Sequence, residues 1–98
     1  MSRPKKERCI RCDPKAVYFK PRAIPLVQLE EVSLGSDELE AIRLADYERR
    51  YHQEAASEMK VSRPTFGRIL TRAHQKIAEA LIKGKAIRIE TSQKEERK

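Results

Sequence analysis

The stretch YHQEAASEMKVSRPTFGRILTRA, from Tyr51 to Ala73, decides the fold that this sequence predicts. Its pattern is that of two short helices that cross over a tight turn, with Ala56 small at the point where they touch. The side chains expected to fill the space between them are Ala55, Met59, Val61, Phe66 and Ile69. Such a unit, a helix-turn-helix, presents its second helix to the major groove of DNA.

The second helix of this unit should be long. The Ser62 hydroxyl is suited to cap it, and Pro64 is tolerated in a first turn that needs no intrahelical N–H bond. Apolar residues keep the helical period as far as Lys83, and Gly84 is a natural left-handed terminator. At ~1.5 Å per residue the helix is about 30 Å long, so only its first two or three turns fit a major groove.

A further helix is predicted before this unit. Ser36 is a good N-cap, and Asp37 and Glu38 place negative charge on the first turn, where the helix dipole favours it. This helix should run to about Glu48 and break around residues 49–50. The next helix should cover residues 51–60, with a turn over residues 60–62.

Three shorter segments complete the predicted elements. Residues 16–19, AVYF, read as a strand, and residues 85–90, KAIRIE, as a second strand that would pair with AVYF or with its copy in another subunit. Residues 25–34, PLVQLEEVSL, suit a short helix, although a strand remains open.

The sequence therefore predicts a mainly α fold. Its core is a three-helix helix-turn-helix domain over residues 23–90 that includes the C-terminal strand, preceded by an extended basic N-terminal arm (1–22) and followed by a disordered tail (91–98). No apolar run is long enough to cross a bilayer, and the N-terminus lacks an apolar signal region. We therefore expect a cytoplasmic protein with no membrane partner.

Charge is segregated along the chain. The formal net charge of +7 arises from a basic start, an acidic middle (residues 23–59, three basic against nine acidic side chains) and a basic end. Separation of the signs favours a polyanion as the partner of the basic parts.

The polar side of the long helix is the predicted DNA-reading surface. On a helical wheel, Pro64, Gly67, Arg68, Thr71 and Gln75 lie opposite the apolar stripe, flanked by Arg63 and Arg72. Arg68 suits the paired acceptors of guanine, and Gly67 permits close approach of the backbone. Phosphate contacts are expected from Lys60, Arg63, Arg72 and the N–H groups at the helix start capped by Ser62, and from Arg3, Lys5 and Lys6 of the arm.

Cys9 and Cys12 form a C-x-x-C pair, which supplies half of a tetrahedral Zn site. A four-thiolate site would need a second subunit, because neither His52 nor His74 stands at a completing spacing. Two reduced thiols in a flexible arm, or a redox switch, are the alternatives. Apart from this optional Zn site, no cofactor is expected.

The whole pattern resembles two families. The helix-turn-helix and the preceding DELEAIRLAD are similar to region 4 of bacterial sigma factors. More closely, residues 3–90 resemble a small family of predicted DNA-binding proteins of archaea and bacteria, through the motifs RPKKER, YFKP, IPL, LEEV, DELEAIRLAD, EAASEM, VSRPTFGRIL, KIAEAL and GKAIRIE. The resemblance implies DNA binding and transcriptional regulation, carried by Ser62, Arg63, Thr65, Arg68 and Arg72.

The chain departs from the helix-turn-helix pattern in two places. Lys60 stands where such turns usually hold Gly, which predicts a positive φ for a non-glycine residue. Arg49 and Arg50 replace the Gly-hydrophobic pair that usually precedes the second helix.

We expect a sequence-specific DNA-binding regulator whose recognition helix covers about residues 63–83, and no enzyme, because the sequence holds no catalytic constellation. A homodimer is a plausible form, since two half-sites read more sequence than one. The alternatives are a module that contacts the transcription machinery through an acidic surface (residues 30–58), and a Zn- or redox-responsive regulator. Phe19, Tyr47 and Tyr51 are interpreted as packing residues.

Overall fold

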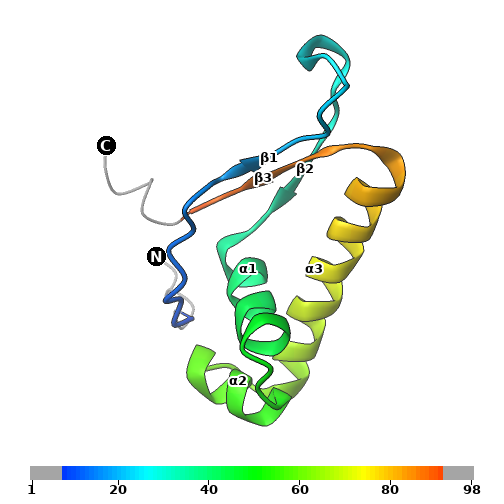
Figure 1. Ribbon diagram of the computed structural model, residues 1–98. Helices are drawn as coiled ribbons and strands as arrows, with labels where there is room; N and C mark the ends of the chain where they lie inside the picture. The colour runs from blue at the N-terminus through cyan, green and yellow to red at the C-terminus, as the bar shows by residue number, and fades with distance from the viewer. Residues whose placement is uncertain (1–7, 92–98) are drawn as a thin grey trace, which may run out of the picture.

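The fold of residues 8–91 is described from a computed structural model, and it is mainly helical with a small three-stranded sheet (Figure 1). Its main elements are β1 (Tyr18–Phe19), β2 (Glu31–Leu34), α1 (Ser36–Ile42), α2 (His52–Met59), α3 (Arg63–Lys83) and β3 (Ala86–Ile89). The arm residues Arg3, Lys5 and Lys6, and residues 92–98 of the predicted tail, lie outside the described residues. No helix within residues 8–91 is long and apolar enough to cross a membrane.

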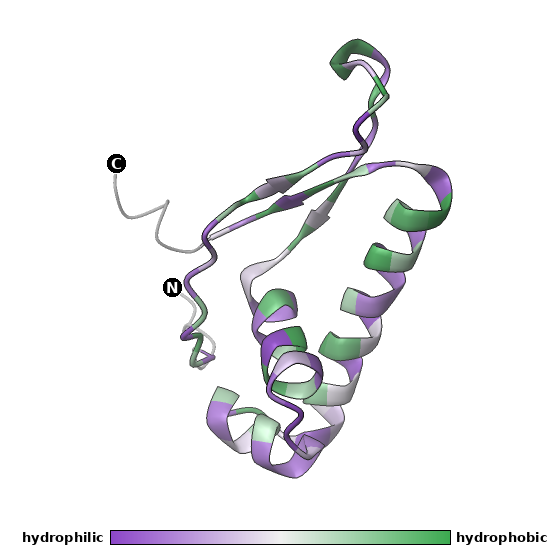
Figure 2. Ribbon diagram, viewed as in Figure 1, coloured by the Kyte–Doolittle hydropathy of each residue, from purple (hydrophilic) through white to green (hydrophobic). Residues whose placement is uncertain are grey.

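Helix α3 has the predicted boundaries. The Ser62 hydroxyl accepts a hydrogen bond from the Thr65 N–H at 3.2 Å, and Gly84 ends the helix with a left-handed φ of 69°. The buried side of α3 consists of Phe66, Ile69, Leu70, Ala73 and Ala80. In Figure 2 apolar and polar residues alternate along α3, as expected for a helix with one side in the core.

The main core lies where α1, α2 and α3 meet. Ala55, Met59 and Phe66 are completely buried, and Ile69 is 1% exposed, while Val61 packs at the margin. These are the residues predicted to fill the space between the two helices, so that prediction is confirmed. Burial of side chains as large as Met59, Phe66 and Ile69 contributes roughly 1.5–3 kcal/mol each.

Helix α1 begins one residue earlier than predicted. Gly35, and not Ser36, is the N-cap, and its N–H donates to the Glu38 carboxylate at 2.8 Å. After Ile42 the chain continues as a π-helical segment, Arg43–Tyr47, in which the Glu48 N–H donates to the Arg43 carbonyl at 2.8 Å. Helical structure therefore stops close to the predicted end.

The sheet has the order β1-β3-β2, with β3 in the centre. Strand β3 pairs antiparallel with β1 and parallel with β2, so the predicted pairing of AVYF with the C-terminal strand is confirmed within one chain. Of the two predictions for residues 25–34, the short helix is wrong and the strand is confirmed for the second part of the segment. A 3-10 turn covers only Leu26–Gln28, and Glu31–Leu34 is a strand because β3 offers it a ladder of backbone hydrogen bonds.

One face of the sheet packs against α3. Leu34 and Ile89 form a second apolar cluster with Ala73, and the Lys76 ammonium donates to the Ser33 carbonyl at 2.7 Å. Helix α3 as a whole is too long for a major groove, and its later turns pack against the sheet instead.

Among residues 8–91, two non-glycine residues adopt a left-handed backbone, and both lie in turns around α2. Lys60 has φ 62°, as its place in the turn predicted, and Arg49 has φ 59° in the turn between α1 and α2. Both positions are those at which the sequence departs from the usual glycine-containing pattern.

The interpretation of three aromatic residues as packing residues is wrong. The exposed fractions are 82% for Tyr47, 79% for Tyr51 and 53% for Phe19. Small and aliphatic side chains fill most of the core. Tyr47 is left at the end of the π-helical segment, Tyr51 at the start of α2 and Phe19 on the edge strand β1. Of the two histidines, His52 contacts the edge of the Phe66 ring, and His74 is hydrogen-bonded to Asp46 at 2.7 Å.

Candidate nucleic-acid interface

Most of the predicted reading residues lie together on the exposed side of the first half of α3. A single shallow depression is lined by Pro64, Gly67, Arg68, Thr71 and Arg72. Gln75 does not line it, because it lies one turn further on, beside Ala78 and Ile82 in a separate depression. Of the seven residues that the helical wheel placed on or beside this surface, five therefore line one depression, and Gln75 and Arg63 do not.

The first turn of α3 is organised by hydroxyl groups. Ser62 donates to the Thr65 hydroxyl at 2.9 Å, and the Arg68 guanidinium donates to that same oxygen at 3.4 Å. These contacts hold the exposed Arg68 side chain against the start of the helix. Lys60 in the preceding turn and Arg63 in the first turn are also exposed.

Arg72 is held by a buried carboxylate. Its Nε lies 3.3 Å from Glu38, which is 4% exposed and also accepts a hydrogen bond from Lys76 at 2.8 Å. Burial opposes ionisation of Glu38, but the bonds from Lys76, from the Gly35 N–H and from Arg72 hold its pKa below the usual value. Because the Arg72 side chain remains 52% exposed, it can still meet an anion at the rim of the depression.

Gly67 lies at the floor of this surface. A Cβ atom built at this position would meet nothing within 4 Å, so packing inside the protein does not require glycine here. Glycine in the middle of a helix costs about 1 kcal/mol relative to alanine. The residue therefore weakens α3 without a packing reason inside the chain.

The arm is attached to the helices through backbone N–H groups within the C-x-x-C segment itself. The Cys9 N–H donates to the carbonyl of Met59, the last residue of α2, at 3.1 Å. The N–H groups of Arg11 and Cys12 donate to the Glu40 carboxylate at 3.2 and 3.0 Å. The segment that follows the predicted phosphate-binding arm residues is thus fixed next to the turn that begins α3.

Glu40 is the anchor of this attachment. It is 1% exposed and receives two further hydrogen bonds from the Arg43 guanidinium, at 2.8 and 3.0 Å. Burial opposes ionisation of the carboxylate, but Arg43 and the two arm N–H groups hold its pKa below the usual value.

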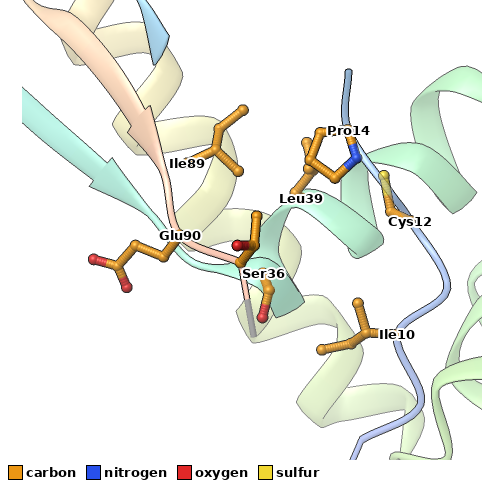
Figure 3. Close-up of a pocket in the computed structure, with 8 residues that line it drawn as sticks. Ile10, Cys12, Pro14, Ser36, Leu39, Ile89 and Glu90 are labelled. Carbon is orange, nitrogen blue, oxygen red and sulfur yellow. The ribbon is translucent and has the colours of Figure 1, made fainter. Parts of the chain in front are cut away.

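Both cysteines are half-buried thiols. Cys12 lines a small pocket with Ile10 and Pro14 of the arm, the start of α1 and the end of β3 (Figure 3). Burial, and the neighbouring Glu40 carboxylate, raise the pKa of the Cys12 thiol. Among residues 8–91 no cluster of three or more Cys, His, Asp or Glu side chains could hold a metal ion. A Zn site shared between two chains stays a prediction.

Several acidic side chains of the middle segment are engaged inside the protein. Glu38 and Glu40 are buried, Arg50 pairs with both Glu48 and Glu58, and Asp37 lies 3.0 Å from Arg8. The acidic surface expected for a protein partner is therefore smaller than the sequence suggests. The roles of Glu38 and Glu40 were missed from the sequence, where Glu38 was interpreted only as a favourable charge in a first turn.

Comparison with known proteins identifies the family. A family model described as "Protein of unknown function DUF134" matches residues 1–97, and the chain belongs to this family. A UPF0251 protein of Caldanaerobacter subterraneus subsp. tengcongensis is 60% identical over 90 residues, which cover 92% of this chain and 76% of the relative. A UPF0251 protein of Thermoanaerobacter sp. is 53% identical over 90 residues, which cover 92% of this chain and 80% of that relative. No solved structure matches the chain.

Proposed function

We propose that this member of the DUF134 family is a sequence-specific DNA-binding protein that regulates transcription, with the first half of α3 as its recognition helix. The observation that carries the proposal is the surface of that half-helix. Its buried side packs on α1 and α2, while Pro64, Gly67, Arg68, Thr71 and Arg72 share one exposed depression. A helix braced from behind by two others is the arrangement that helix-turn-helix proteins use in the major groove.

The side chains divide into two roles. Arg68 and Thr71 line the depression and are proposed to contact base edges, with Arg68 released from Thr65 and paired to guanine O6 and N7. Lys60, Arg63 and Arg72 lie around it and are proposed to contact phosphates, which fix the position of the protein on DNA without reading sequence. The Glu38 carboxylate supports this assignment because it fixes the position of the Arg72 guanidinium, whose Nε lies 3.3 Å away.

Gly67 adds a steric argument. Since a Cβ here would meet no neighbouring element of residues 8–91 within 4 Å, we propose that glycine serves the approach of another molecule. A DNA backbone or base edge that approaches the helix at this point would contact the added methyl group.

The decisive experiment compares two arginine variants on two kinds of DNA. The preferred site is first selected from a random pool, and binding is then measured by fluorescence anisotropy on that site and on random DNA. Arg68→Ala should weaken binding to the selected site by about 1–3 kcal/mol and relax the preference at one base pair. Arg88→Ala removes the same charge from the sheet, where Arg88 contacts Glu31, and should change both affinities little.

Two results would contradict the proposal. If Arg68→Ala weakened binding to both DNAs equally, Arg68 would not contact base edges. No binding to any DNA at low salt would remove the DNA-binding role altogether, and would favour a contact with a protein of the transcription machinery.

Gly67→Ala separates a structural role of this residue from a binding role. We expect the variant to be more stable than the wild type by up to about 1 kcal/mol, since alanine is the better helix former. We expect it to bind the selected site more weakly. Thermal unfolding and anisotropy measure the two effects, and unchanged affinity would show that DNA does not approach Gly67.

A further inference from the structure

Strand β1 is an edge strand whose outer side is open. Residues 15–20 are all exposed, and β1 pairs only with β3 in the described structure. The Ile89 N–H donates to the Val17 carbonyl at 2.9 Å, so the backbone polar groups of Val17 face β3. Because successive residues of an antiparallel strand face opposite sides, the N–H and C=O groups of Tyr18 face away from β3.

The same strand carries apolar side chains that the fold does not cover. Val17 is 45% exposed and Phe19 is 53% exposed. Through their pairing with Ile89 and Ile87 they lie on the sheet face that packs on α3, but at its uncovered edge. An open edge beside exposed apolar residues is a site at which another strand can pair.

We propose that the occupant of this edge is β1 of a second copy of the chain, related by a two-fold axis through Tyr18. In this antiparallel register Tyr18 pairs with its own copy, and Ala16 pairs with Lys20 of the other chain. With residues 16–20 extended in the dimer, these positions direct their N–H and C=O groups toward the second copy, so each pair forms backbone hydrogen bonds. Val17 then stands opposite Phe19 of the second copy, an aromatic and β-branched pair of the kind that stabilises sheets.

Charge and proline positions fit the same register. Lys20 stands across from the small Ala16 of the other chain, whose neighbour one strand further on is the acidic Glu90, on the same face of the sheet. No two like charges face each other, since Lys15 stands opposite Pro21. That proline is at a non-hydrogen-bonded position, where it removes no ladder bond.

The interface does not depend on the proposed DNA binding, and its test uses no DNA. The Cys9→Ser, Cys12→Ser background receives either Tyr18→Cys or Lys20→Cys. Across the two-fold axis the Cα atoms of residue 18 would lie about 5.5 Å apart, within disulfide range. Those of residue 20 would lie roughly 14 Å apart along the strands, too far to be bridged.

With oxidised glutathione as the oxidant, Tyr18→Cys should form a covalent dimer at low micromolar protein and Lys20→Cys should remain a monomer on non-reducing gels. Circular dichroism checks that both variants are folded. Equal cross-linking of both variants, or of neither, would overturn the proposed register.

Sedimentation equilibrium tests the same surface without cysteine. The wild-type chain should form a dimer, and Phe19→Asp should lower its association constant at least tenfold. Val27→Asp is the matched control, because Val27 is 90% exposed in the 3-10 turn, where Figure 2 shows a second apolar area. A monomeric wild type, or a larger effect of Val27→Asp than of Phe19→Asp, would contradict the proposal.

Discussion

At the scale of single residues, the two turns around α2 hold backbone strain where glycine would relieve it. Lys60 and Arg49 both have φ near 60°, a conformation that costs a residue with a Cβ about 1 kcal/mol. At Lys60 the strained residue is also a cation beside the start of the proposed recognition helix. A stability cost at such a position is expected when the side chain serves binding.

Lys60→Gly should therefore raise the free energy of unfolding by about 0.5–1 kcal/mol, because glycine adopts the left-handed conformation without steric cost. It should also weaken binding to all DNA sequences alike, through loss of one proposed phosphate contact. Lys60→Ala is the control that removes the charge and keeps the strain. Urea unfolding and anisotropy measure the two effects, and a Gly variant less stable than the Ala variant would contradict the strain argument.

Cys12 permits a prediction on pH. Since burial and the Glu40 carboxylate raise the pKa of its thiol, the thiol is protonated at neutral pH. In a Cys9→Ser variant, alkylation by iodoacetamide should be slower than for an unfolded control in urea. The rate should reach half its maximum at a pH above the ~8.5 of a free cysteine. A midpoint at or below that value would show that Cys12 is activated rather than protected.

At the scale of elements, Glu40 joins three segments of the chain. Its carboxylate on α1 binds the arm through two N–H groups and the π-helical segment through Arg43. The pKa of Glu40 is lowered in the folded protein, so its stabilising effect is present above the pKa of the unfolded state and is lost as pH falls through the folded value.

Glu40→Gln should lower the free energy of unfolding at pH 7 by about 1–3 kcal/mol, because charged hydrogen bonds to buried groups are lost. The difference between variant and wild type should shrink below about pH 4.5, where the carboxylate of the unfolded state becomes protonated. Glu54→Gln, on an exposed part of α2, is the matched control. Urea titrations at several pH values check this, and a difference that does not depend on pH would contradict the ionised state of Glu40.

The same scale shows which elements a sequence can predict. Helix α3 was predicted to the residue, because Ser62, a long apolar period and Gly84 each act within a few residues of the feature that they determine. Strand β2 was predicted less well, since Glu31–Leu34 becomes a strand only through pairing with β3, more than fifty residues later. Likewise, the wheel placed Pro64, Gly67, Arg68 and Thr71 on one surface, but the contact of Arg72 with Glu38 depends on how α1 crosses α3.

At the scale of the whole molecule, positive charge lies at both ends of the sequence, while part of the acidic middle is buried. Cys9 is hydrogen-bonded to Met59 at the end of α2, close to the turn that precedes α3. We propose that Arg3, Lys5 and Lys6, which lie outside the described residues, act on the same DNA as α3, and salt dependence measures how many charges do so.

Neutralising Arg3, Lys5 and Lys6 together, each to Gln, should reduce the slope of log affinity against log salt by about 2–3 on duplex DNA. Preference between the selected site and random DNA should change little, because phosphate contacts carry no sequence information. Titrations at several salt concentrations check this. The control variant Lys83→Gln, at the far end of α3, should leave the slope unchanged, and an unaltered slope for the triple variant would exclude the arm from DNA contact.

The central position of β3 has a consequence for biosynthesis. On the ribosome, β1 and β2 emerge long before Ala86–Ile89, and neither pairs with the other in the finished sheet. Because β3 lies between them, β1 and β2 lack their partner until Ala86–Ile89 has been synthesised. The three-stranded sheet therefore depends on the last strand of the described chain, and a chain that stops before Ala86 cannot form it.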